Sequence, residues 1–137
     1  MLLMADGADG KFPLDPIRLM KGCFLVSQIG RTEWQGLFAF EPYDYGPFDA
    51  SVYRARDALL AKGLLDEEEL GRYSEYSITE HGRTQVASLI ASGETSDEDA
   101  DWFRSIGRWV TSKSFNELLR EIYEQFPGFA TRSIARL

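Results

Sequence analysis

The sequence contains few side chains of the types that carry out catalysis. It has one histidine, His81, and one cysteine, Cys23, far apart in the chain. It contains no glycine-rich phosphate loop, no His-Glu zinc motif and no nucleophile elbow. We therefore expect no catalytic activity, no metal site and no cofactor. His81 is interpreted as a surface helix residue and Cys23 as a small side chain of the core.

Two pairs of carboxylates have a spacing that acid–base chemistry could use. They are Glu41 with Asp44 and Asp44 with Asp49, in the segment PYDYGPFD and just before it. Because this segment also holds two prolines and a glycine, turn formation and helix capping are the favoured interpretation. Five aromatic residues of the same region could stack on bases or on a planar ligand. The favoured interpretation is again structural, as an anchor for the turn: Phe38, Phe40, Tyr43, Tyr45 and Phe48.

Composition is that of one folded domain or one module with an extension. The 137 residues are 44% hydrophobic and 27% charged, and no apolar run reaches the length of a membrane span. A single cysteine cannot form an internal disulfide. Proteins without disulfides are typical of the cytoplasm, where we expect this protein to reside. The net charge of −7 opposes nonspecific affinity for nucleic acid. Any contact with DNA therefore requires a local basic patch, doubled by dimerisation.

Hydrophobic periodicity and capping residues predict the elements that position these side chains. Residues 1–12 are expected to be a flexible N-terminal tail, and Asp15-Pro16 begins a helix that runs to about Gln28. Further along, the sequence predicts a strand at 37–41, a rigid turn, a helix of about 13 residues after a cap at Asp49, a hairpin of 64–67 with 73–79, and a helix at 80–92.

Two further helices are predicted around the acidic hinge at residues 92–101. Ser96 begins the first, and Ser114 with Glu117 forms a capping box that begins the second. We interpret 13–93 as one domain and 94–137 as a helical extension that forms a homodimer. The predicted dimer contacts are Trp102, Trp109, Phe115, Leu118, Ile122 and Phe126.

The helix after Asp49 has one apolar face, on which Val52, Ala55 and Leu59 fall together. Its opposite face consists of small residues with one cation, and Lys62-Gly63 ends it. Arg56 projects toward the apolar side, where we expect it to be paired. A free helix face followed by a hairpin is the arrangement with which DNA-binding modules read bases and hold phosphates. The candidate DNA contacts are Ser51, Tyr53, Arg54, Lys62, Arg72 and Arg83.

The segment from 48 to 92 resembles the winged-helix regions of PadR-like and MarR-like bacterial transcriptional regulators. RDALLAKGLL at 56–65 is similar to their Leu-x-x-Leu-x-x-x-Gly-Leu helix end, and 76–82 is similar to their Tyr-x-Leu-Thr-x-x-Gly hairpin exit, with Ile78 in place of Leu. PYDYGPFD and YEQFPGFATRS look closer to a less characterised bacterial group with the same core. The resemblance implies a winged helix-turn-helix, mainly α with a small β-hairpin wing (α+β), and a C-terminal helical extension.

By this resemblance, the protein is a homodimeric regulator that binds double-stranded DNA. The alternative is a winged-helix module that binds another protein and not DNA, as an antitoxin-like or phage-defence component would. The acidic charge and the small outward helix face favour that alternative.

Overall fold

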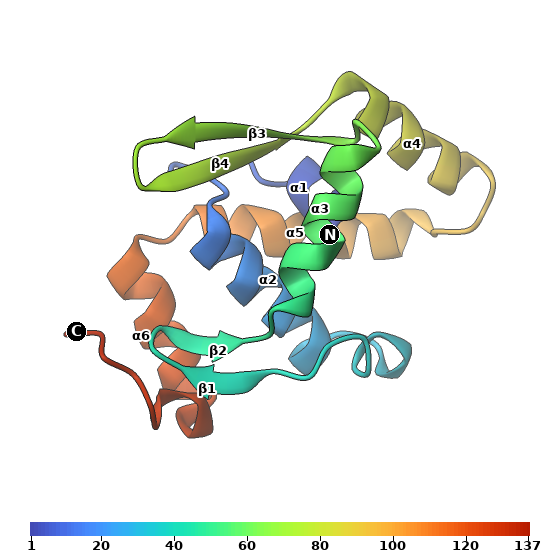
Figure 1. Ribbon diagram of the computed structural model, residues 1–137. Coiled ribbons are helices and arrows are strands. Elements are labelled where there is room, and N and C mark those ends of the chain that lie inside the picture. The colour runs from blue at the N-terminus through green and yellow to red at the C-terminus, as the bar shows by residue number, and fades with distance from the viewer.

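Six α-helices and two separate antiparallel hairpins make up the computed structural model, which describes residues 1–137 (Figure 1). The expected α+β class is confirmed. No helix combines the length and the apolar character that crossing a membrane requires. The elements are α1 (Leu2–Asp6), α2 (Pro16–Ile29), β1 (Glu41–Tyr43), β2 (Gly46–Phe48), α3 (Ser51–Ala61), β3 (Leu65–Leu70), β4 (Tyr73–Ile78), α4 (Glu80–Ala91), α5 (Asp97–Thr111) and α6 (Phe115–Gln125), with short 3-10 turns at Thr32–Trp34 and Pro127–Ala130.

Helix α2 is the central element, as its two apolar sides predicted. Asp15 caps it by accepting a hydrogen bond from the backbone N–H of Arg18, and Pro16 begins its first turn. Leu19 and Phe24 are fully buried. The ring of Phe24 packs edge-on against several aromatic rings from the loop before β1 and the turn after α6. One core cluster therefore contains residues from both ends of the chain.

The prediction of a flexible tail over residues 1–12 is wrong. Residues 2–6 form α1, which lies against α5, and Leu2, Met4 and Ala5 are buried. The two backbones touch directly, because a methyl group at Gly107 would overlap the carbonyl oxygen of Met4. A helix of five residues is too short to show a periodic hydrophobic pattern, and its burial depends on α5, which is distant in the sequence. The sequence therefore contains no local signal for α1.

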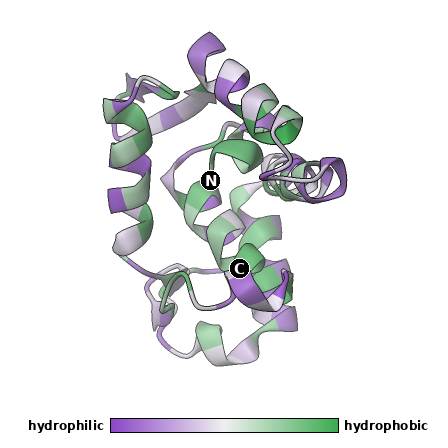
Figure 2. Ribbon diagram, turned by 90° about the vertical axis from the view of Figure 1, so that its right-hand side faces the viewer, coloured by the Kyte–Doolittle hydropathy of each residue, from purple (hydrophilic) through white to green (hydrophobic).

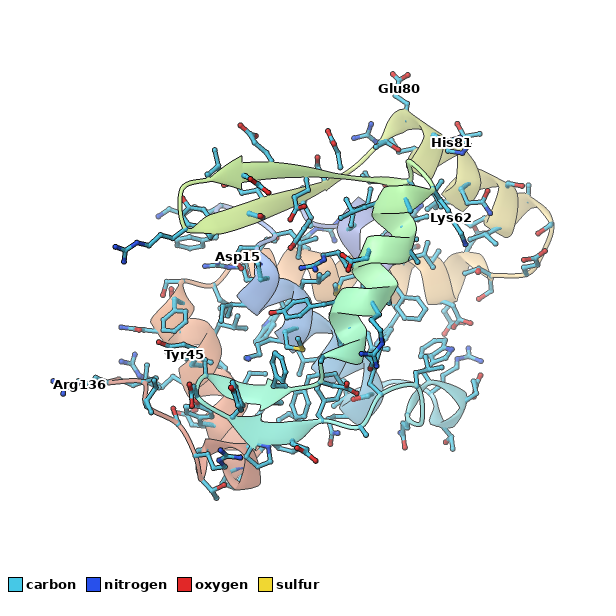
Figure 3. The ribbon with its side chains drawn as sticks, in the orientation of Figure 1. Asp15, Tyr45, Lys62, Glu80, His81 and Arg136 are labelled. Atoms are coloured by element: carbon cyan, nitrogen blue, oxygen red, sulfur yellow. The ribbon has the colours of Figure 1, made fainter.

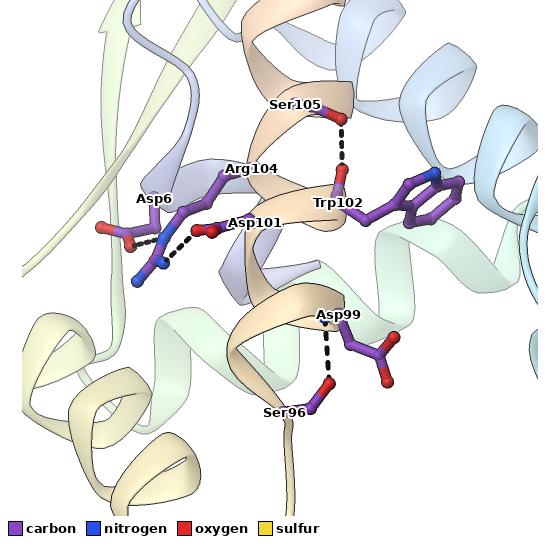
Figure 4. A network of polar contacts seen from close by, with 7 residues as sticks. All are labelled: Asp6, Ser96, Asp99, Asp101, Trp102, Arg104 and Ser105. Atoms are coloured by element: carbon purple, nitrogen blue, oxygen red, sulfur yellow. Dashed lines mark hydrogen bonds and ion pairs between the residues drawn. The ribbon is translucent and has the colours of Figure 1, made fainter.

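Ion pairs add to the attachment of α1. The guanidinium of Arg104 on α5 bonds the carboxylate of Asp6 at 2.8 Å and that of Asp101 at 3.1 Å (Figure 4). In the same helix, Ser96 caps the first turn by accepting from the N–H of Asp99. Helix α5 thus begins where the sequence predicts, and it holds the N-terminus in place.

The first hairpin differs from its prediction. The strand expected at 37–41 is absent except for Glu41, and the proline-rich segment itself forms β1 and β2, with Pro42 opposite Pro47. A proline has no N–H to donate, so this ladder stays short. Gly46 adopts a φ of 90°, which a glycine reaches without steric cost.

Residues 94–137 do not form a separate unit. Helix α5 packs on α1 and α2, and Val110 and Leu118 belong to the same core as Leu19. The capping box of Ser114 and Glu117 is present, as predicted. The apolar face of α6 therefore packs inside its own chain. It is not available to a second copy, contrary to the interpretation of 94–137 as a dimerisation element.

Candidate nucleic-acid interface

Helix α3 is held to the rest of the fold along one face. Val52 is its only fully buried residue, while Ala55 and Leu59 are half-buried, as the apolar face predicted. Figure 2 shows α3 at the left edge of the molecule, with no other helix beyond it. Asp49 bonds the N–H groups of Ser51 and Ala39 and so fixes the start of the helix, although Ala50 occupies the N-cap position. A single anchored face leaves the rest of α3 free to contact a partner.

The four candidate DNA contacts of this region divide into two groups. Arg54 and Lys62 are exposed, and neither forms an ion pair. Tyr53 is half-buried and turns inward, with its ring 5.9 Å from that of Phe48, and burial raises the pKa of its phenol. Ser51 is half-buried beside Asp49. Tyr53 is therefore a packing residue, and the free cations of α3 are Arg54 and Lys62.

Arg56 joins α3 to the second hairpin. Its Nη1 donates to the Tyr76 hydroxyl at 2.8 Å, and its Nε donates to Asp57 at 3.0 Å. The guanidinium also lies 4.5 Å from the centroid of the Tyr53 ring. Tyr76 is 5% exposed, and burial raises the pKa of its phenol, which therefore stays protonated at neutral pH. The expectation that Arg56 is paired inside is confirmed, and the pair fixes the hairpin relative to α3.

The hairpin β3–β4, which the sequence predicted as a wing, is strongly acidic. It follows α3 after Gly63 and turns at Gly71, and both glycines adopt positive φ. Arg72 lies exposed at the tip, as predicted. It is the only cation of the hairpin. The strand β3 presents four exposed acidic residues in succession: Asp66, Glu67, Glu68 and Glu69. A hairpin of this composition repels phosphates along its length.

Arg83 lies apart from the free cations of α3. It is exposed on α4, where it borders a depression together with Asp6 and Arg104, and no residue of α3 lines that depression. Lys62 lies near the start of α4 (Figure 3), because the carbonyl oxygen of the next residue, Gly63, accepts a hydrogen bond from Thr79, the N-cap of that helix. The structure thus brings Lys62 to the junction of α3 and α4 and places Arg83 toward α1 and α5.

The predicted dimer contacts also divide, and two of them are wrong. Leu118 and Ile122 are 0% and 1% exposed, because α6 turns its apolar face into the core of its own chain. Phe126 is half-buried against Phe24 in the same chain. Phe115 is 37% exposed and packs on Tyr45. Helical spacing alone could not distinguish a core face from a dimer face.

Among the predicted dimer contacts, Trp102 and Trp109 remain partly accessible, as Phe115 does. Both tryptophans are half-buried, and they line an open depression of about 420 Å³ between α2, α5 and α6. Ile29, 54% exposed, lies on its edge. This apolar face is available to a second copy.

The residues considered for catalysis do not meet in one site. Cys23 is buried in α2, where desolvation raises the pKa of its thiol, whereas His81 is exposed on α4. Asp49 has the structural role expected of it, since its carboxylate bonds two backbone N–H groups. No group of three or more histidine, cysteine or acidic residues is arranged to hold a metal ion.

Sequence reasoning missed Lys21. This lysine is 2% exposed in α2 beneath the first hairpin, and its ammonium group donates to the carbonyl oxygen of Pro47. The signal was present, since Lys21 follows Ile17, Leu19 and Met20 on a helix predicted to be apolar on two sides.

Comparison of the chain with protein-family models, with curated proteins and with solved structures found no match.

Proposed function

We propose that the protein is a dimeric DNA-binding transcriptional regulator of the winged-helix type, in which α3 enters a DNA groove. The exposure of α3 is the observation that carries this proposal, because a helix held by one face offers the other to base edges. The second hairpin directly follows α3, and the contact of Arg56 with Tyr76 sets its position. The succession of α3 and the second hairpin is the one that the resemblance to PadR-like and MarR-like regulators implies, whereas the hairpin β1–β2 precedes α3 where a helix-turn-helix has its first helix.

Charge determines how such a protein would bind. One copy offers two free cations on α3, Arg54 and Lys62, and Arg72 at the hairpin tip. The acidic strand β3 opposes closer approach of the hairpin to the phosphates. A single copy would therefore bind weakly, and two copies acting on a two-fold symmetric site would double the number of phosphate contacts.

The dimer in this proposal forms through the face that carries Trp102 and Trp109. A shallow, mainly apolar depression with an exposed side chain such as Ile29 on its edge is typical of surfaces that pair with a partner. A two-fold axis at this face would bring the same surface of the two copies into contact. Leu118 and Ile122 take no part in this interface.

The acidic hairpin favours a second candidate function. Four successive exposed carboxylates on β3 and a net charge of −7 suit a basic protein surface better than a phosphate backbone. In this alternative the protein is a winged-helix interaction module, antitoxin-like or part of phage defence, and it does not bind DNA.

Fluorescence polarisation at low salt, with DNA from the region upstream of the protein's own gene, separates the two candidates. The regulator should bind this DNA, and Arg54→Ala combined with Arg72→Ala should abolish binding. Arg136→Ala is the control for removal of a single cation elsewhere, because Arg136 projects from the C-terminal end, on the side of the molecule away from Lys62 (Figure 3). Absence of binding by the wild type, or binding that the double variant leaves unchanged, would support the interaction module.

A further inference from the structure

Lys21 is a buried amine without an acidic partner. It is 2% exposed, its Nζ donates to the carbonyl oxygen of Pro47 at 3.1 Å, and it forms no ion pair. An ammonium group in such a place loses its hydration without gaining a counter-ion, which favours the neutral amine. A neutral lysine is a nucleophile, whereas a protonated one is not.

A small pocket lies beside this amine, between α2, the hairpin β1–β2 and α3. Its volume is about 120 Å³, and Lys21 lines it together with Ile17, Met20, Tyr43, Tyr45, Phe48 and Tyr53. Tyr43 and Tyr45 are 46% and 41% exposed and stand at its mouth. A cavity of about 150 Å³ holds benzene. The pocket is somewhat smaller than that and opens to solvent beside Tyr43 and Tyr45, so it can take at most one planar ring, whose substituent would reach Lys21.

Gly46 keeps the space around the amine open. A Cβ atom at this position would lie 3.4 Å from Cε of Lys21 and 3.2 Å from Cε1 of Tyr123, and the φ of 90° disfavours any side chain there. The turn of the first hairpin thus combines a glycine next to the amine with tyrosines on both sides of the opening.

Three tyrosines share the pocket with Lys21. Burial lowers the pKa of Lys21 to about 7, so about half of the amine is neutral at pH 7. Tyr53 faces the pocket from α3, and burial raises the pKa of its phenol. Tyr43 and Tyr45 face it from the hairpin, with the guanidinium of Arg132 lying 5.8 Å from the Tyr43 ring. The nearby carboxylate of Asp49 is occupied by two backbone N–H groups.

We propose that Lys21 is a nucleophilic amine that condenses reversibly with a small aromatic aldehyde bound in this pocket. Nζ attacks the carbonyl carbon to form a carbinolamine, and the carbon–oxygen bond then breaks. The oxygen leaves as water with the two hydrogens of the amine, and a carbon–nitrogen double bond forms, without oxidation or reduction. The tyrosine and phenylalanine rings stack on the aldehyde, which raises its local concentration at the amine.

Tyr53 connects this pocket to α3, so an occupant would change how the start of that helix is held. This regulatory consequence rests on the function proposed above. The condensation does not, and a labelling experiment without DNA tests it separately.

The test treats the wild-type protein at pH 7 with benzaldehyde and sodium cyanoborohydride, which reduces the imine to a stable benzylamine. Peptide mapping by mass spectrometry then compares Lys21 with the other three lysines, Lys11, Lys62 and Lys113. We expect Lys21 to be labelled about tenfold faster than any of them, because an ordinary lysine in water is almost wholly protonated at this pH. Pyrene-1-carboxaldehyde, which is too large for the pocket, should not label Lys21.

Two variants complete the test. Lys21→Met should retain the circular dichroism spectrum and lose the fast label, while Lys62→Met should keep it. Labelling of the exposed lysines ahead of Lys21, or equal labelling of Lys21 by both aldehydes, would overturn the proposal. Because the comparison among lysines uses the wild type, it decides the matter even if Lys21→Met fails to fold.

Discussion

Gly107→Ala tests the direct contact between α1 and α5. The new methyl group would overlap the carbonyl oxygen of Met4 and lie 3.2 Å from the backbone nitrogen of Ala8. Both partners are backbone atoms, which a side-chain rotation cannot move. The variant must therefore displace α1 from the surface on which it is buried.

The magnitude follows from what α1 buries. Leu2 and Met4 are 9% and 1% exposed, and burying a side chain of this size stabilises a protein by about 1.5–3 kcal/mol. Complete release of α1 would thus cost about 3–6 kcal/mol. Alanine returns about 1 kcal/mol of helix propensity within α5. With partial relaxation, we expect the free energy of unfolding to fall by about 2–4 kcal/mol.

Differential scanning calorimetry measures this loss, and roughly 10 °C in Tm is expected for a chain of this size. Gly128→Ala is the matched control, because nothing lies within 4 Å of its new Cβ, and its stability should change by less than about 0.5 kcal/mol. Hydrogen exchange should locate the change in residues 2–8. A Tm for Gly107→Ala at or above that of the wild type would refute the close approach of the two helices.

The remaining predictions concern the core, the hairpin and the dimer. Folding lowers the pKa of Lys21 from 10.5 to about 7, so the unfolded chain binds more protons between these values. Denaturant titrations should therefore show that the difference in free energy of unfolding between the wild type and Lys21→Met rises with pH across this window, by up to roughly 5 kcal/mol. Below pH 7 this difference should be constant. Tyr76→Phe removes the acceptor of Arg56 and should cost about 1–2 kcal/mol, and a double-mutant cycle with Arg56→Met should show coupling. Trp109→Asp should give a folded monomer in light scattering, whereas Leu118→Asp, which buries a charge at a fully enclosed position, should prevent folding.

Local signals in the sequence predicted most of the helices correctly. Asp15-Pro16, Thr79, Ser96 and Ser114 begin helices by capping backbone N–H groups, and these interactions depend on neighbours within three residues. Gly63 likewise marked the end of α3, because its positive φ is a local property. Elements with such boundaries were accessible from the chain alone.

Features that depend on distant contacts were not predictable. The burial of Met4 requires Gly107, and the partner of the Lys21 amine, the carbonyl oxygen of Pro47, lies on a hairpin that the sequence did not predict. Similarly, Leu118 faces its own core and not a second copy, which periodicity cannot reveal. Among the candidate DNA contacts, the sequence indicated that Arg54 is free but gave no reason for Tyr53 to turn inward, since that follows from packing on Phe48.

DNA binding through α3 is tested most directly by the salt dependence of polarisation with upstream DNA. If Arg54, Lys62 and Arg72 of two copies contact six phosphates, the logarithm of affinity should fall against the logarithm of salt concentration with a slope of about −5.4. Arg54→Ala should remove two of these contacts and change the slope to about −3.6, while Arg136→Ala should leave it unchanged. A wild type that does not bind at low salt, or a slope that Arg54→Ala leaves at its original value, would contradict the assignment of α3 as the DNA-binding helix.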